Sequence, residues 1–511
     1  MSSTELTTER VAPSPRIVDS ALARRAAAIL AVAAGFGLLV QLLFVEALLG
    51  INFPITIAVL LGAGWFARDR TTPGPDLTDL WIAPAALFLA AFVAIRGDST
   101  LIALDVLGTL GLTGLALASF GGLAVVRRPL ERVMRLANEI VGWSIFGAAR
   151  TMGMAQSAAP GQARTALARG APLVRGLLIA VPLVLIFTFL FASADAVFAE
   201  MAEDLFNWDL DADELVARSL TAVIAAWAAA GLLGLVALRD RAEDPPVIST
   251  ERTRLRIGTT ECLIVLVTLD VLFAAFVVIQ AAYLFGGLDT LAASGMTYAE
   301  YARRGFFELL AVAFLVAGLI LGLEALVARR SRAYVVAAVV LVGLTVVVLG
   351  SSLLRLRLYQ EAYGWTELRF YVLAAIGWLA IGALATIGAL ATNRTRWLLH
   401  FMVILSVAFG VAFNLIGPVR FIAEQNVARA VDPSLVPPGG ETGLDVYYLS
   451  SLGTDADIVM ANALPQLPEL ERAEVAAALA DSAAYLAQQP FGDAWQGWNY
   501  SRQTAKALLV E

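Results

Sequence analysis

Apolar residues in this chain form long uninterrupted blocks that short polar segments separate. Because a helix of about 20 apolar residues crosses the hydrocarbon core of a bilayer, each long block predicts a membrane span. The second and third blocks are short, and a tilted or re-entrant hairpin is the alternative for them. The pattern predicts an all-α fold, a polytopic transmembrane helix bundle. We predict eleven spans, at residues 26–48, 53–66, 80–95, 101–125, 173–191, 219–238, 260–284, 305–327, 333–354, 370–391 and 398–416.

Arginines are concentrated in alternate connecting segments. Arg24 and Arg25 precede the first block, and the long segment after the fourth block is rich in arginine. Since cytoplasmic loops carry an excess of basic residues, the distribution predicts a cytoplasmic N-terminus and an outer C-terminus. One miscounted short block would reverse the side on which the C-terminus lies.

Two polar regions outside the blocks have helical periodicity. The string LERVMRLANEIVGWSIFGA predicts an amphipathic helix at the membrane surface, and a docking site for a cytoplasmic partner is the alternative. The acidic tail from Arg420 onward predicts a small helical domain. The chain thus divides into a disordered cytoplasmic N-terminus (1–25), a first four-span membrane region (26–125), a cytoplasmic loop with the amphipathic helix (126–172), a seven-span membrane region (173–416) and an extracytoplasmic helical tail domain (417–511).

Composition agrees with a membrane protein and excludes several kinds of site. The chain is 59% hydrophobic and 15% charged, whereas a soluble domain carries about 25% charged residues. Cys262 is the only cysteine and His400 the only histidine, so this chain alone builds no Cys/His zinc site and no multi-histidine haem or copper site. We expect no catalytic residues, no metal and no cofactor. The lipid bilayer is the expected partner, and nucleic acid is not.

One acidic residue lies in the middle of an apolar block. Asp270 interrupts LIVLVTLDVLFAAFVVI, and a charge at that depth usually faces a bundle interior or a water-filled cavity. It is a candidate proton or cation site, and a protonated carboxyl bonded to a neighbouring helix is the alternative. Glu46, Asp105 and Glu324 also fall within spans, but near their ends, where water is within reach.

Arginines and tyrosines gather near the predicted outer face, in TYAEYARRGFFELL and SSLLRLRLYQEAYGWTELRFYV. Guanidinium groups bind phosphate and carboxylate groups through two hydrogen bonds, so these segments suit an anionic lipid or a small anion. An interfacial aromatic belt with snorkelling arginines is the alternative. Arg357 and Glu361 also have the spacing of an i,i+4 pair. The candidate ligand-binding residues are Asp195, Tyr301, Arg304, Glu308, Arg355, Arg357, Tyr359 and Glu361.

Several ordered strings resemble a known group of bacterial multi-spanning proteins, domain of unknown function 4173. They are LIFTFLFASADAVFAE, TYAEYARRGFFELLAV, LRLRLYQEAYGWTELRFYV, LDVYYLSSLG and WQGWNYSR, between about residues 173 and 509. The resemblance implies a multi-pass protein of the bacterial inner membrane and brings no activity, ligand or catalytic residue. The strings coincide with the outer polar segments selected above by their chemistry.

Three functions follow from these observations. We favour a non-enzymatic component of envelope assembly or sensing, which binds a lipid or an envelope protein at its outer face. An ion-coupled solute transporter that uses Asp270 is the first alternative. A membrane transferase that uses a polyprenyl-linked donor is the second alternative. Many such enzymes carry an acidic pair in a long first outer loop, whereas this loop is very short here, so another outer acidic segment would have to form the site.

Overall fold

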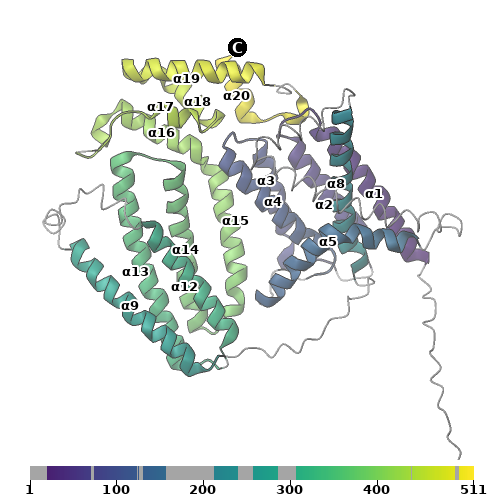
Figure 1. Ribbon diagram of the computed structural model, residues 1–511, viewed down its shortest axis with the longest axis horizontal. Coiled ribbons are helices and arrows are strands. Elements are labelled where there is room, and N and C mark those ends of the chain that lie inside the picture. Colours follow the sequence, from purple (N-terminus) through teal and green to yellow (C-terminus); the bar gives the residue numbers. More distant parts are fainter. Residues whose placement is uncertain are drawn as a thin grey trace, which may run out of the picture. The chain divides into compact units, whose positions relative to one another are not determined.

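The computed structural model describes residues 20–70, 74–123, 125, 130–156, 212–239, 257–285, 306–327, 329–438, 440–489 and 494–510 (Figure 1). These residues form helices and connecting turns, and the one β-type contact among them is an isolated parallel bridge between Ile257 and Val327. The all-α prediction is confirmed for this part of the chain. The predicted span 173–191 lies outside the described residues.

The chain divides into two compact units. Unit 1 comprises Met1–Leu42, Ala63–Thr72 and Glu139–Glu243, and unit 2 comprises Leu43–Gly62, Pro73–Asn138 and Asp244–Glu511. The described helices are α1 (Ser20–Phe44), α2 (Asn52–Ala67), η1 (Leu77–Asp79), α3 (Ile82–Val93), α4 (Ser99–Phe120), α5 (Leu130–Gln156), α8 (Ala212–Leu238), α9 (Thr259–Phe285), α12 (Phe306–Leu326), α13 (Arg332–Tyr363), α14 (Glu367–Ala391), η3 (Thr395–Trp397), α15 (Leu398–Ile416), α16 (Pro418–Val431), η4 (Pro433–Leu435), α17 (Val446–Ser450), α18 (Thr454–Ala463), η5 (Leu464–Gln466), α19 (Glu469–Gln488), η6 (Trp495–Gly497) and α20 (Tyr500–Leu509).

Six of the described helices are long and apolar enough to cross a membrane, and a bent pair makes a seventh candidate span. The protein is therefore a multi-pass membrane protein whose helices require a lipid environment. Two shorter apolar helices, Asn52–Ala67 and Leu77–Val93, cover the second and third predicted spans. The total of eleven spans and their orientation stay predictions. The six helices are Ala21–Phe44, Ser99–Phe120, Arg218–Leu238, Thr259–Gln280, Arg332–Tyr363 and Glu367–Ala391.

In unit 1, α5 packs closely against α8. The predicted amphipathic segment is helical, and this helix also packs directly against a membrane helix. A Cβ atom on Gly231 of α8 would lie 2.1 Å from the carbonyl oxygen of Trp143, so glycine permits this contact. The indole of Trp227 donates a hydrogen bond of 2.7 Å to the carbonyl of Ile145.

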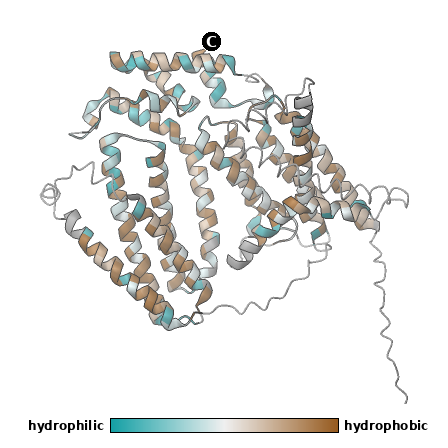
Figure 2. Cartoon of the chain, in the orientation of Figure 1, coloured by the Kyte–Doolittle hydropathy of each residue, from teal (hydrophilic) through white to brown (hydrophobic). Residues whose placement is uncertain are grey.

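In unit 2, α13 lies at the centre of a helical bundle and contacts α9, α12 and α14. Its buried face carries Tyr334, Leu341 and Leu349. A second group pairs α3 with α4 and adds α15. Apolar residues predominate along α9 and α12–α14, whereas α16–α20 alternate polar and apolar residues (Figure 2).

The helices α16–α20 form a C-terminal helical domain at one end of α13, α14 and α15 (Figure 1). Leu449, Met460 and Val475 are fully buried in its core. The domain begins where α15 and α16 meet at an angle of 49°. Gly417 occupies the bend with a φ of +68°, and a Cβ atom there would lie 2.6 Å from Nη1 of Arg96. The predicted boundary at residue 417 coincides with this bend.

Candidate functional site

The structure describes five of the eight candidate ligand-binding residues. Asp195, Tyr301 and Arg304 lie outside the described residues. Glu308 is exposed in the first turn of α12. The other four, Arg355, Arg357, Tyr359 and Glu361, occupy the last turns of α13.

Two further arginines bind carbonyl oxygens at the arginine-rich end of α13. No ion pair joins Arg357 to Glu361 in the described structure, although their spacing would allow one. The guanidinium of Arg369 lies 4.2 Å from the ring centroid of Tyr359 and donates a hydrogen bond of 2.6 Å to the carbonyl of Gly364. Arg429 donates to the carbonyl of Glu361 over 2.7 Å. These two guanidinium groups therefore stabilise the C-terminal end of α13 through carbonyl oxygens that the helix leaves without partners.

Hydrogen bonds from the start of α20 to backbone carbonyls connect the C-terminal domain to the end of α3. Asn499, which is 2% exposed, donates its amide to the carbonyls of Val93 (3.0 Å) and Arg96 (2.9 Å). Its side-chain oxygen accepts from the N–H of Arg502 at the start of α20. The N–H of Tyr500 donates to the carbonyl of Ala94 over 2.8 Å. Carbonyls at the end of one helix thus receive the free N–H groups at the start of another.

A second set of contacts lies beside the first. The N–H of Gly97 donates to the Asp455 carboxylate over 3.0 Å, and the hydroxyls of Thr454 and Ser501 lie 2.7 Å apart. A Cβ atom on Gly97 would lie 2.1 Å from the hydroxyl of Thr454, so only glycine fits. We call the contact of Val93–Asp98 with Gly453–Asp455 and Trp498–Arg502 the tail junction.

Two other short loops reach the same domain. The N–H of Ile51 donates to the carbonyl of Trp498 over 2.9 Å. The amide side chain of Asn426 bonds both backbone groups of Trp365, each over 2.8 Å. The loops that carry Ile51, Gly97 and Trp365 therefore all contact the C-terminal domain.

Asp98 is the N-cap of α4 and carries a buried charge at the tail junction. It is 1% exposed, and one carboxylate oxygen accepts from the N–H of Leu101 over 2.9 Å. The other oxygen has no hydrogen-bond partner. Burial raises the pKa of this carboxyl from 3.8 to about 6. The N–H of Leu101 opposes that shift in pKa, and the negative charges of Glu367 and Asp455 add to it.

Sequence reasoning undervalued a second buried acid near this junction. Asp105 was set aside as lying near a span end, yet it is 2% exposed and accepts a 2.7 Å hydrogen bond from Asn414. The sequence does contain a signal for this pair, since Asn414 is a polar amide within the apolar string VAFGVAFNLI.

Asp270 is half-buried on α9, and its Oδ1 is buried without a hydrogen-bond partner among the described residues. No group of three or more metal-ligating Asp, Glu, His or Cys side chains occurs among the described residues.

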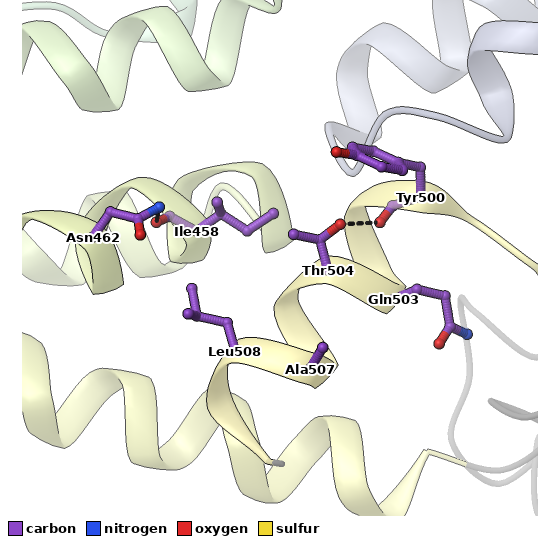
Figure 3. A pocket seen from close by; sticks show the side chains of 7 residues that line it. All are labelled: Ile458, Asn462, Tyr500, Gln503, Thr504, Ala507 and Leu508. Carbon is purple, nitrogen blue, oxygen red and sulfur yellow. Dashed lines mark hydrogen bonds between the residues drawn. The ribbon is translucent and has the colours of Figure 1, made fainter.

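An open groove of about 550 Å³ lies between α18 and α20 on the C-terminal domain. Figure 3 shows Ile458 and Asn462 of α18 opposite Thr504 and Leu508 of α20. None of the described residues that line the groove is charged. Its lining residues are Ile458, Asn462, Tyr500, Gln503, Thr504, Ala507 and Leu508.

Replacing Asn499 by alanine should loosen the C-terminal domain. Asn499→Ala leaves the buried carbonyls of Val93 and Arg96 and the N–H of Arg502 without these partners, which costs about 2–4 kcal/mol. We expect faster amide hydrogen exchange in residues 500–510 than in the native protein. Asn462→Ala is the matched control, since that exposed amide bonds only the carbonyl of Ile458 in its own helix. Equal exchange in the two variants would contradict this role of Asn499.

The buried Asp98 should make the protein less stable as the pH rises. Because its folded pKa lies above 3.8, the folded state binds the proton more tightly than the unfolded state does. Stability should therefore fall between about pH 4 and about pH 6, by about 3 kcal/mol. Asp98→Asn keeps an N-cap and removes this part of the fall. Thermal unfolding across that interval tests the prediction, and an unchanged pH profile in the variant would refute it.

Comparison with known proteins identifies one family. The model of "Domain of unknown function (DUF4153)" matches residues 83–463, from α3 to the end of α18. The resemblance to domain of unknown function 4173 is not confirmed, although an uncharacterised domain does cover most of the chain. No curated protein and no solved structure matches. This membrane protein, with its helical domain fastened to the loops between its spans, belongs to the DUF4153 family.

Proposed function

We propose that this protein is a non-enzymatic component of the bacterial inner membrane that serves envelope assembly or sensing. Its C-terminal helical domain receives an envelope protein in the groove between α18 and α20. The observation that carries the proposal is an accessible apolar groove on a domain that buried hydrogen bonds fasten to the membrane loops. A partner bound there acts directly on the ends of the membrane helices.

The chemistry of the groove favours a protein segment over an anionic head group. Apolar, amide and hydroxyl side chains line it together. The C-terminal domain also carries exposed aromatic residues, with Tyr485 67% and Trp495 63% exposed. Protein interfaces are enriched in aromatic side chains and depleted of charge at their centre. An anion would need a cation in the lining, and an anionic lipid at Arg355 and Arg357 stays a separate prediction.

A second candidate function, ion-coupled transport, is favoured by Asp270. A carboxylate oxygen without a hydrogen-bond partner, buried on a membrane helix, is costly and usually functional. The helix that carries it, α9, packs against α13, so Asp270 lies on an element of the bundle of unit 2. The transferase has no comparable observation among the described residues.

The partner should form a covalent adduct with a photo-reactive amino acid at position 503. We expect one defined envelope protein in the adduct recovered from intact cells, because Gln503 lines the groove. Adding Leu508→Glu should reduce the yield about tenfold, since a charge in an apolar contact costs more than 1 kcal/mol. The same reagent at exposed Glu474 on α19 is the control. A lipid adduct, or equal adducts from both positions, would contradict a protein partner.

The transport candidate is tested by proton flux in proteoliposomes under an imposed pH gradient. Asp270→Asn keeps the shape of the side chain and removes the ionisable group, so it should reduce the flux at least tenfold with normal expression. Thr268→Val on the same helix should leave the flux unchanged, because that hydroxyl bonds only the carbonyl of Ile264. Native flux in Asp270→Asn would eliminate Asp270 as the coupling site.

A further inference from the structure

Asp105 and Asn414 form a buried pair between two membrane helices of unit 2. Asp105 belongs to α4 and Asn414 to α15, and they are 2% and 0% exposed. The side-chain N–H of Asn414 donates to Oδ1 of Asp105 over 2.7 Å. The pair lies two helical turns from Asp98, about 10 Å deeper along α4.

The hydrogen bonds of Asn414 leave two oxygen atoms without a donor. Its Nδ2 group donates both to Asp105 and to the carbonyl of Gly410, the latter over 3.0 Å, which fixes the orientation of the amide. Oδ1 of Asn414 and Oδ2 of Asp105 are both buried and have no hydrogen-bond partner among the described residues. An ionised carboxylate and an amide oxygen can only accept hydrogen bonds. Each of these two buried acceptors therefore lacks a hydrogen-bond donor, and one hydrogen shared between them would supply it.

No cation forms an ion pair with Asp105 in the described structure. The positive charge of Arg96 offsets part of a negative charge on Asp105 from a distance, but its guanidinium donates to the backbone carbonyl of Asn414 over 3.1 Å. Helix α3 contains no titratable residue. The only titratable residue of α15 is His400, in its first turn, whereas Asn414 is near its end.

The remaining charged groups near the pair are acidic. Asp98 caps α4, and its carboxyl is influenced by Glu367 and Asp455. Tyr371 of α14 has a buried hydroxyl without a hydrogen-bond partner. A carboxylate at position 105 would add a negative charge to this group, whereas a neutral acid would not.

We propose that Asp105 and Asn414 form a proton-binding site, in which one proton is held between Oδ2 of Asp105 and Oδ1 of Asn414. A proton from water forms the O–H bond on Oδ2 and neutralises the carboxylate. The O–H group then supplies the donor that the amide oxygen lacks, and the two side chains form an acid–amide pair. This site is distinct from the proposed partner-binding groove, because its ligand is a proton and it lies between membrane helices.

A proton fits the site better than a metal cation does. Hard cations such as Ca²⁺ or Mg²⁺ take about six oxygen ligands, whereas two oxygens are left over here. Asp98 lies too far along α4 to complete such a shell. The pair also lies below the loop whose Gly97 bonds the C-terminal domain, so release of the proton would alter charge beside the tail junction.

Infrared spectroscopy of the full-length protein in lipid nanodiscs tests the proposal. A protonated carboxyl has its own carbonyl-stretch band, which shifts in heavy water. We expect the native protein at neutral pH to show a band that is lost in Asp105→Asn. That variant should still fold, because two amides can also pair. Asp79→Asn is the control and should retain the band, because the hydrogen bonds of Asp79 go to Val125 and Ser119 and the substitution leaves the Asp105–Asn414 pair intact.

A second variant keeps the test decisive if Asp105→Asn fails to fold. Asn414→Leu removes both the donor and the acceptor of the pair, so the band should move to higher frequency. The pH at which the proton is lost should also shift by about one unit, a tenfold change in proton affinity. Identical spectra of native protein and Asp105→Asn, or an unmoved band in Asn414→Leu, would overturn the proposal. Loss of the band in sodium chloride but not in choline chloride would show a cation site instead.

Discussion

The structure of unit 2 depends on how two helix ends satisfy each other at the tail junction. A helix leaves carbonyls bare at its C-terminal end and N–H groups bare at its N-terminal end, and near a bilayer there is little water to bond them. The end of α3 and the start of α20 supply these groups to each other, and Asn499 bonds to both. The C-terminal domain is therefore a structural part of the membrane unit, because without it the end of α3 would lose its partners.

Docking of the C-terminal domain also determines the electrostatic environment of the acidic residues on α4. The loop that carries Gly97 is covered by α18 and α20, so Asp98 is removed from water although it lies at the end of a span. Arg96 reaches the bend between α15 and α16, where only a glycine leaves space for its guanidinium. The acidic groups near α4 thus share a weakly polar environment with no cation paired to Asp98 or Asp105 in the described structure. A change of charge there and a change in docking cannot be independent of each other.

Sequence and structure agree where the signal is local. Apolar length predicted the helices because it depends only on residues that are neighbours along the chain. The contacts that build the tail junction are long-range: Asn499 bonds a carbonyl 406 residues earlier in the chain. Asp105 was undervalued for the same reason, since its burial depends on α15, which follows 309 residues later. The anion site predicted at Arg355 and Arg357 stays a prediction, and beside it carbonyls at the end of α13 accept from Arg369 and Arg429.

The choice of an amide as the partner of Asp105 has a functional consequence. An arginine at that position would hold the carboxyl ionised, and breaking the ion pair would leave a buried charge at high cost. An asparagine can donate to a carboxylate and can also accept from a protonated acid, so the pair survives either protonation state. A membrane helix that ends beneath a docked domain can therefore change its charge and keep its packing. That property suits a protein that senses conditions at the membrane and passes the change to a partner bound outside it.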